Sequence, residues 1–409
     1  MQPEIAHIFR LHGEHYRSLY PVSPEQRKAM HDIVLCRTRA LGGHLELCDR
    51  GCGYARISYN SCRNRHCPKC QSLQQARWLQ NRTQRLLPTH YFHMVFTLPH
   101  ELNPLVLQNK ERLYNLLFQA ASQALLALAR GYRRLGAEVG FTAVLHTWTQ
   151  DLLFHSHLHI VATGGGLHAS GDRWVSSKNN FLLPVKALSK IFRAKLLDSL
   201  QEAFHQGTLS CAGTIKHLKD PKTFRRFIRT LRRKKWVLYC KQPFDGPQQA
   251  FSYVSRYTHR VAISNDRLVS CSNGKVSFRA RDNTTPGQLR VLTLSAHEFI
   301  RRFLLHVLPK GFVRIRHYGL LAPRNAKTKL EIARQSILQT NPEAGHHQPF
   351  LKQNEQSNKP WQQLMKELTG LDLHTCPKCG KGKLVRIRLS SLTFLSLRIQ
   401  TPVAILDSS

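Results

Sequence analysis

Residues 154–161 read Phe-His-Ser-His-Leu-His-Ile-Val, and this stretch determines both the expected fold and the expected site. On a β-strand, side chains two residues apart point to the same face of the sheet. His155, His157 and His159 would therefore form a row of imidazoles, while the leucine and isoleucine pack on the opposite face. Neutral imidazole is the commonest metal ligand in proteins. The spacing alone leaves two interpretations open, a metal site or a solvent-facing strand rich in histidine.

The charge of the chain indicates a polyanionic partner. Its 409 residues include 61 Lys and Arg but only 24 Asp and Glu, giving a formal net charge of +37. So large a charge opposes compaction, and it is spread through segments with folded patterns, which favours a nucleic-acid surface. No run approaches about 18 apolar residues, and the N-terminus lacks a signal-peptide pattern. We therefore expect a cytoplasmic protein of two to four domains.

Closely spaced thiols predict an N-terminal zinc site. The chain has 11 cysteines, and in a reducing compartment such clusters indicate metal sites rather than disulfides. Tetrahedral Zn²⁺ would replace the core that about 30 residues cannot build. The favoured ligands are Cys48, Cys52, Cys67 and Cys70, with Cys62 and His66 as rivals.

The other cysteines divide into one further pair and four single residues. Cys376 and Cys379, followed by glycine, form one half of a zinc ribbon. The neighbouring sequence lacks the second half, so His374 or a partner chain would have to complete a second Zn²⁺ site. Three single cysteines are expected to be small packed or surface residues: Cys211, Cys240 and Cys271. The same is expected of Cys36, although it lies close enough to the N-terminal cluster for membership to stay open.

Three groups of cations are candidate DNA contacts. The first lies on the zinc knuckle, the second on an expected helix over 222–236 whose charged face carries no acid, and the third on one face of an expected strand over 313–318. A solvated helix face is the ordinary alternative for a run of charge. Phosphate contact is the favoured interpretation for these residues: Arg63, Arg65, Lys69, Arg225, Arg229, Arg232, Arg314 and Arg316.

A tyrosine pair adds a candidate nucleophile. Tyr253 and Tyr257 are four residues apart on an expected helix over 247–259, so their rings share one helix face. Such a pair alone usually indicates aromatic packing. Beside a histidine row and a nucleic-acid charge, it indicates covalent attack on a DNA phosphodiester, helped by a cation that neutralises phosphate charge. Histidine ligation suits Mn²⁺ as well as Mg²⁺.

These residues resemble a known family. His157-Leu158-His159 resembles the paired-histidine motif of the HUH endonucleases, and Tyr253-x3-Tyr257 resembles the two-tyrosine motif of the rolling-circle transposases of insertion sequence family ninety-one. The resemblance spans about residues 25–325 and is highly specific in combination. It includes four further segments: residues 60–70, 96–102, 146–148 and 308–319.

The resemblance implies both a mechanism and site roles. His157 and His159 would bind the divalent metal, with His155, Gln150 or His100, in that order, as third ligand. The two tyrosines would nick and rejoin single-stranded DNA at element ends through 5′-phosphotyrosine intermediates. The histidine rings must then face the tyrosine helix across a gap wide enough for one phosphate. The oligomeric state stays open.

The expected fold is α+β. An N-terminal zinc knuckle or ribbon (1–87) precedes an HUH-type antiparallel sheet flanked by helices (88–338), and a linker and half-ribbon follow (339–409). Residues 164–166, Gly-Gly-Gly, would end the histidine strand by a turn or a close backbone approach. Two alternative functions remain: a plasmid replication initiator or relaxase, and a zinc DNA-binding protein without catalytic activity.

Overall fold

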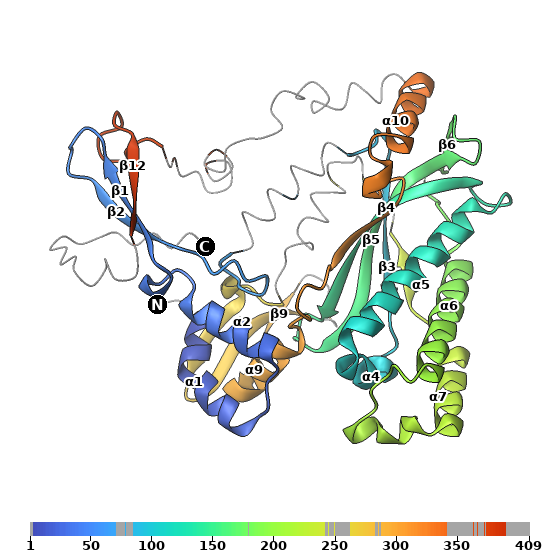
Figure 1. The fold of residues 1–409 in the computed structure, drawn as a ribbon, viewed down its shortest axis with the longest axis horizontal. Helices are drawn as coiled ribbons and strands as arrows, with labels where there is room; N and C mark the ends of the chain where they lie inside the picture. Colours follow the sequence, from blue (N-terminus) through green and yellow to red (C-terminus); the bar gives the residue numbers. More distant parts are fainter. Residues whose placement is uncertain are drawn as a thin grey trace.

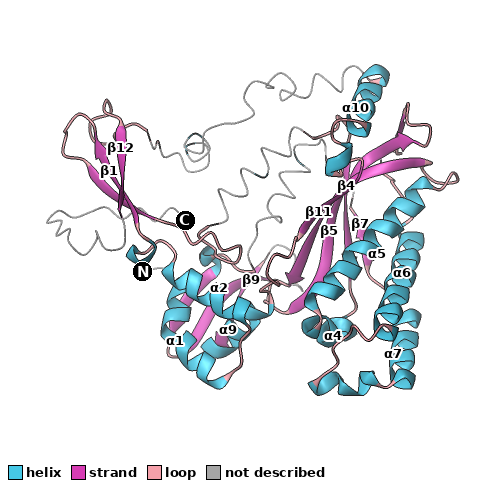
Figure 2. Ribbon diagram, viewed as in Figure 1, coloured by secondary structure: helices cyan, strands magenta, loops and turns pink. Residues whose placement is uncertain are grey.

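The protein is described here from a computed structural model. It describes residues 3–70, 85–178, 180–241, 262–282, 288–341 and 374–389, with a few isolated residues between them. Helices and antiparallel sheets are mixed, as the sequence predicts (Figures 1 and 2). None of the described helices is long and apolar enough to cross a membrane.

The largest sheet has six strands and carries the histidine stretch. Its order is β11-β4-β5-β3-β7, with β6 paired to β5, and all pairings are antiparallel. Its two long central strands, β4 and β5, form an antiparallel hairpin. The strands are β3 (Tyr91–Thr97), β4 (Ala137–Trp148), β5 (Phe154–His168), β6 (Trp174–Ser176), β7 (Leu238–Cys240) and β11 (Ile315–Gly319).

The triple glycine does not end β5, which continues to His168. A Cβ at Gly164 would overlap the ring of His90, and one at Gly166 would overlap the backbone of Glu138. The glycines therefore allow the close backbone approach that was one of the two expectations. The strand continues through them, with a register shift against β4 between Val139 and Phe141.

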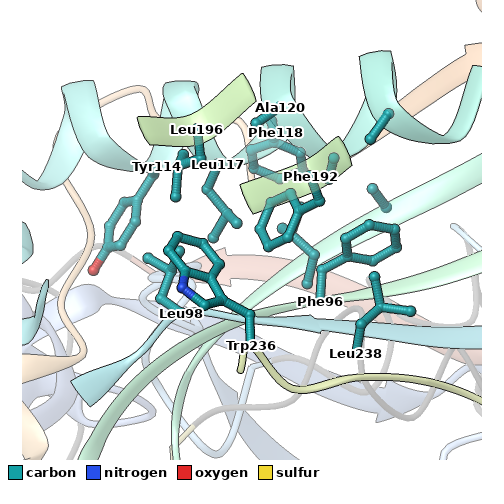
Figure 3. Packing of buried hydrophobic residues seen from close by; sticks show 14 of the residues in the cluster. Phe96, Leu98, Tyr114, Leu117, Phe118, Ala120, Phe192, Leu196, Trp236 and Leu238 are labelled. Atoms are coloured by element: carbon teal, nitrogen blue, oxygen red, sulfur yellow. The ribbon is translucent and has the colours of Figure 1, made fainter. Parts of the chain in front are cut away.

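Helices cover one face of this sheet: α4 (Asn103–Gln108), α5 (Lys110–Arg130), α6 (Val185–His205) and α7 (Pro221–Arg233). Leu158 and Ile160 of β5 are fully buried in the core beneath them. Phe96 of β3 meets Phe192 of α6 edge to face, with ring centroids 5.1 Å apart (Figure 3). The histidines of β5 alternate with these residues and so point to the other face.

A second core unites the start of the chain with a later segment. Phe9 of α1 packs edge to face on Phe303 of α9, with centroids 5.3 Å apart. The domain division near residue 87 stays a prediction, but these N-terminal helices share their core with residues 262–307. The elements are α1 (Ile5–Leu19), α2 (Pro24–Leu35), β8 (Leu268–Ser272), β9 (Lys275–Arg281), β10 (Leu289–Ser295) and α9 (Ala296–Leu305).

The third sheet joins the two ends of the described chain. Its order is β12-β1-β2, formed by β1 (Gly43–Cys48), β2 (Ala55–Tyr59) and β12 (Leu384–Leu389). Figure 1 shows β12 beside β1 and β2, although more than 300 residues separate them in sequence. The remaining elements are α10 (Lys329–Thr340) and the 3-10 helices η1 (Arg39–Leu41), η2 (His100–Leu102), η3 (Gly213–Lys219), η4 (Asn265–Arg267) and η5 (Pro323–Asn325).

Candidate metal centres

Three histidines converge on the face of the six-stranded sheet that lies opposite α4–α7. His157 and His159 come from β5, and His146 is the cross-strand partner of His157 on β4. One ring nitrogen from each of the three lies within 4.8 Å of the others. The Nε2 atoms of His157 and His159 are 3.1 Å apart. The histidine pair therefore gains its neighbour from the adjacent strand.

The third histidine of the cluster is not one of the three expected candidates. His155 lies on the same face, with its ring 5.4 Å from that of His157, but it does not belong to the cluster. His100 is strongly exposed in η2, and Gln150 lies in the turn between β4 and β5. The bulge between His146 and Trp148 adjusts the strand register at this point. His146 takes the expected place of His155.

Hydrogen bonds orient both imidazoles of the pair. His157 donates from Nδ1 to the carbonyl oxygen of His155 at 2.9 Å, so its Nε2 is left for the centre. The Nδ1 atom of His159 is 2.9 Å from Nε2 of His93, a buried residue of β3. Such a partner on the far nitrogen fixes the ring and tautomer of a metal-ligating histidine.

Burial keeps these imidazoles neutral. It lowers the pKa of His157 to about 4, and burial together with His146 holds the pKa of His159 well below its usual value. A neutral ring has a free lone pair for a metal ion. The 3.1 Å separation also matches the roughly 3.0 Å expected between neighbouring ligands of an octahedral ion at about 2.1 Å. The donor set therefore fits a six-coordinate divalent cation.

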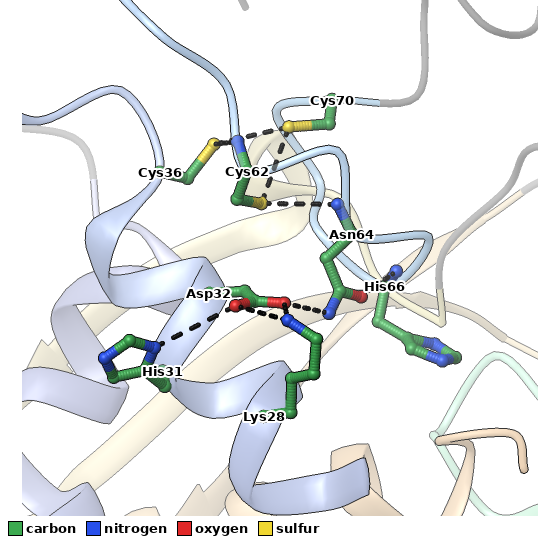
Figure 4. A network of polar contacts seen from close by, with 8 residues as sticks. All are labelled: Lys28, His31, Asp32, Cys36, Cys62, Asn64, His66 and Cys70. Atoms are coloured by element: carbon green, nitrogen blue, oxygen red, sulfur yellow. Dashed lines mark hydrogen bonds and ion pairs between the residues drawn. The ribbon is translucent and has the colours of Figure 1, made fainter. Parts of the chain in front are cut away.

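Four thiols meet beside the N-terminal helices: Cys36, Cys62, Cys67 and Cys70. The Sγ atom of Cys70 is 3.3 Å from that of Cys36 and 3.7 Å from that of Cys62. A tetrahedral zinc ion with bonds of about 2.3 Å places its sulfurs roughly 3.8 Å apart. Figure 4 shows three of these thiols together.

The expected zinc ligand set is divided between two clusters. Cys67 and Cys70 pair with Cys36 and Cys62, whereas Cys48 and Cys52 lie in a separate cluster. Cys36, expected to be a simple packed residue, belongs to the first cluster because the end of α2 delivers it there.

His66 is not a member of either cluster. Its ring points away from the thiols (Figure 4), and its Nε2 accepts a hydrogen bond from the backbone N–H of Leu308 at 3.4 Å. Loss of solvent, with nearby cations, lowers its pKa to about 3. His66 therefore joins the knuckle to the segment after α9.

The second thiol cluster contains Cys48, Cys52, Cys376 and Cys379. The Sγ atoms of Cys48 and Cys379 are 3.7 Å apart, and those of Cys52 and Cys376 are 3.5 Å apart. The half-ribbon is completed by thiols of the same chain, where His374 or a partner chain was expected.

Several of the cations expected to contact DNA are engaged within the protein. Lys69 pairs with Glu4 at 2.7 Å, and Arg65 donates to the carbonyl of Phe312. Arg314 is buried, and burial lowers its pKa to about 10.

Arg316 is also engaged. Its guanidinium lies 4.2 Å from the ring centroid of Phe118, because the register of β11 turns this side chain toward the helix-covered face. These four residues therefore have partners or burial within the protein, and their contact with DNA phosphates stays a prediction.

The remaining cations are exposed. Arg63 lies at the surface beside the first thiol cluster, and Arg225 and Arg229 line the outer side of α7. Arg232, on the same helix, pairs with Asp198 at 2.8 Å. The apolar stripe of α7 is buried as expected, and Asp220 caps the helix by accepting from the Thr223 N–H at 2.7 Å.

Tyr253 and Tyr257 lie outside the described residues, and so does the expected geometry between them and the histidines. Three residues of the centres escaped the sequence reasoning: His146, His93 and Cys36. His146 had a usable signal, since neighbouring strands of a hairpin bring residues of one face together. For Cys36 the signal was its nearness in sequence to the first cluster, but it belongs to no close thiol pair, so spacing left its membership open.

Comparison with known proteins assigns the chain to a family. Residues 8–98 match the family described as "Transposase zinc-binding domain", and residues 140–329 match the one described as "Putative transposase". The first match and the thiol clusters support Zn²⁺ as a cofactor. The second match includes all three clustered histidines.

Two curated relatives agree. "Putative transposase y4qJ" of Sinorhizobium fredii (strain NBRC 101917 / NGR234) is 47% identical over 388 residues, 95% of each chain. The transposase for insertion sequence element IS801 of Pseudomonas savastanoi pv. phaseolicola is 26% identical over 370 residues, 90% of this chain and 85% of the relative. No solved structure gives a significant match. With zinc-binding and transposase regions in one chain and a near full-length relative, the protein belongs to the IS91 family of transposases, and DNA is its partner.

Proposed function

We propose that this transposase nicks and rejoins single-stranded DNA at the ends of an insertion sequence and so drives rolling-circle transposition. The observation that carries the proposal is the histidine cluster. Two Nε2 atoms 3.1 Å apart, with His146 beside them, form a donor set for a divalent cation on the sheet face opposite α4–α7. An IS91-family transposase with such a centre has the main requirement for metal-assisted phosphodiester chemistry.

His146, His157 and His159 would hold Mg²⁺ or Mn²⁺ there. The bound ion would polarise the scissile phosphate and neutralise charge in the transition state. Burial keeps these imidazoles neutral, and the His155 carbonyl and His93 hold the rings of His157 and His159 in orientation. Little rearrangement is then needed when the ion and the phosphate arrive.

Tyr253 and Tyr257 are the proposed nucleophiles. In each transfer a tyrosine oxygen bonds to phosphorus, the bond from phosphorus to the 3′ oxygen breaks, and that oxygen leaves as a free 3′ hydroxyl. The 5′-phosphotyrosine conserves the bond energy, so a 3′ hydroxyl can reverse the step on the same or another strand. Two tyrosines would allow one DNA end to be held while a second strand is attacked.

A covalent-adduct assay tests the proposal. A labelled single-stranded oligonucleotide carrying an element end is incubated with the full-length protein and Mn²⁺, and denaturing gels report protein–DNA adducts. We expect adducts with wild type, their loss in His157→Ala, and their loss when Tyr253→Phe and Tyr257→Phe are combined. Each single tyrosine variant, tested with an oligonucleotide from each end of the element, shows which tyrosine attacks which end. A shifted native complex without any adduct in wild type would show a DNA-binding protein instead.

A further inference from the structure

We propose that Cys48, Cys52, Cys376 and Cys379 bind one Zn²⁺ ion, and that this ion fastens the C-terminal strand β12 onto the β1–β2 hairpin. This zinc clasp, meaning these four thiols and their ion, is separate from the first thiol cluster. The match to the zinc-binding family ends at residue 98, so that family assigns no role to the two C-terminal thiols. The proposal does not depend on the strand-transfer chemistry.

The sulfur positions fit one tetrahedral ion. The Sγ atoms lie 3.7 Å apart in the pair Cys48–Cys379 and 3.5 Å apart in the pair Cys52–Cys376, and all four fall within 4.8 Å. Zinc bonds of about 2.3 Å predict roughly 3.8 Å between sulfurs. A disulfide would need about 2.05 Å. The thiols are therefore spaced as ligands around a common centre.

The backbone after Cys376 is folded around a sulfur. The N–H of Gly382 donates to Sγ of Cys379 at 3.2 Å, and the N–H of Cys376 donates to the carbonyl of Gly382 at 2.8 Å. A Cβ at Gly382 would overlap Sγ of Cys48. N–H donors toward sulfur stabilise a thiolate, which is the form that binds a metal.

β12 then completes the sheet in register. Its six residues pair with the six of β1, from Gly43 opposite Leu389 to Cys48 opposite Leu384. Asp49 extends the contact, because its Oδ1 accepts from the Lys383 N–H at 2.8 Å. Thus the thiols stand at the end of a strand pairing that brings the two segments together.

A buried acid links the same two segments. Glu46 of β1 is fully buried and accepts hydrogen bonds from Arg56 of β2 at Oε2. Its Oε1 forms an ion pair with Arg386 of β12, at 2.5 Å. Removal of β12 would expose this carboxylate on one side and take away one of its two cations. The pairing is therefore specific for this strand.

The small sheet lacks the apolar burial that would hold β12 by itself. Val385 and Ile387 of this strand remain 50% and 47% exposed. Contact between Cys48 and Cys379 also closes a loop of 331 residues, which has an entropic cost. Structural zinc supplies folding free energy where the apolar core is too small. We therefore expect the ion, and not the sheet alone, to keep β12 in place.

Zinc stoichiometry tests the site. Metal analysis of the full-length protein under reducing conditions should give two zinc ions per chain. Cys48→Ser/Cys52→Ser and Cys376→Ser/Cys379→Ser should each leave one, and the quadruple variant should also leave one. The control variant Cys240→Ser/Cys271→Ser carries the same number of substitutions outside the two clusters, and it should keep two zinc ions. Wild-type protein with one zinc, iron in place of zinc, or two ions in both double variants would overturn the proposal.

A cleavage experiment tests the fastening. A site for a specific protease is inserted between residues 341 and 372 of the full-length protein. The cleaved protein is then analysed by size-exclusion chromatography. The C-terminal fragment should co-elute with the rest in wild type and dissociate after chelation or in either double variant. The quadruple cysteine variant should release no more of the C-terminal fragment than each double variant does, because loss of either cysteine pair already removes the shared zinc ion. The proposal would be overturned if the fragment stayed bound without zinc, or if the quadruple variant released more of it than either double variant.

Discussion

The Nδ1 atom of His159 lies 2.9 Å from Nε2 of His93, and the two imidazole rings stack with only 5° between their planes. His93 thus supports the histidine cluster from the neighbouring strand β3 without being one of its three members. The support is specific in direction, because it engages the nitrogen of His159 that faces away from His157.

Substitution of His93 should weaken metal binding without abolishing strand transfer. His93→Ala is expected to raise the Mn²⁺ concentration needed for half-maximal adduct formation about 10- to 100-fold, the usual effect of losing such a partner. Excess Mn²⁺ should restore the maximal yield. The control is His317→Asn on β11, where the ring contacts Thr142 at 2.8 Å. An unchanged Mn²⁺ requirement in His93→Ala would contradict the positioning role.

The third ligand can be identified by paired alanine variants. His146→Ala should lower Mn²⁺ affinity at least about 10-fold, measured by titration of the full-length protein followed by electron paramagnetic resonance. His155→Ala should bind nearly as wild type, since the group that holds His157 is its backbone carbonyl, which the substitution keeps. If His155→Ala lowered Mn²⁺ affinity and His146→Ala did not, His155 would be the third ligand and His146 of the neighbouring strand would not.

Stability should fall in acid partly through His306. Burial lowers its pKa to about 3, with Nε2 3.1 Å from the Leu152 carbonyl oxygen. The unfolded chain takes up this proton near pH 6.5, whereas the folded chain does not, so protons favour unfolding between those values. From pH 7.5 to 5.5 this one group should cost about 1.4 kcal/mol.

The measurement is urea unfolding of wild type and His306→Gln at both pH values. Other titrating groups, including the thiol clusters, are common to both proteins, so the difference between them isolates His306. The stability gap between wild type and variant should shrink by about 1.4 kcal/mol at the lower pH. A gap that stays constant would show that the pKa of His306 is the same in the folded and unfolded chain.

Gly319 should be far less replaceable than another glycine with the same backbone conformation. Gly319 and Gly311 both have positive φ, 57° and 72°, but a Cβ at Gly319 would overlap the Val139 carbonyl oxygen, whereas one at Gly311 meets no atom within 4 Å. Gly311→Ala should cost about 1–2 kcal/mol. Gly319→Ala should cost at least about 2 kcal/mol more, since β11 must move from β4. Urea unfolding tests this, and equal losses would contradict it.

The exposed cations of α7 should contribute to DNA affinity through charge. Replacement of Arg225 and Arg229 by Gln is expected to lower the slope of log affinity against log salt by about two, one per lost phosphate contact. Arg316→Gln is the comparison, because its guanidinium covers Phe118 and should affect stability and not the slope. Fluorescence anisotropy with a single-stranded oligonucleotide gives the slope. An unchanged slope would make α7 a solvated helix face.

Local patterns in the sequence predicted much of this fold. Period-two alternation predicts that the β5 histidines lie on the face opposite Leu158 and Ile160, and the structure confirms it. The dipeptide Asn273-Gly274 is typical of a type I′ turn, and it joins β8 to β9 with both residues at positive φ. β10 has no comparable signal in the sequence. Its alternation is weak, since most of the strand is exposed.

The pairing of distant segments was beyond these patterns. The expected ligand set placed Cys48 with Cys70 because they are near in sequence, but the fold places Cys48 beside Cys379 and Cys70 beside Cys36. Spacing rules treat a metal site as local, whereas strand pairing decides which thiols meet. His157 and His159, by contrast, are close in sequence, so their spacing alone predicts both their proximity and the face of the sheet on which they lie.

The position of His146, His157 and His159 within one hairpin has a consequence for biosynthesis. The three rings are encoded within a short stretch, so they can meet as soon as β4 and β5 leave the ribosome. Cys48 and Cys52 leave the ribosome early but find Cys376 and Cys379 only after most of the message has been translated. During synthesis, the histidine cluster can therefore be complete long before Cys376 and Cys379 are available to join Cys48 and Cys52.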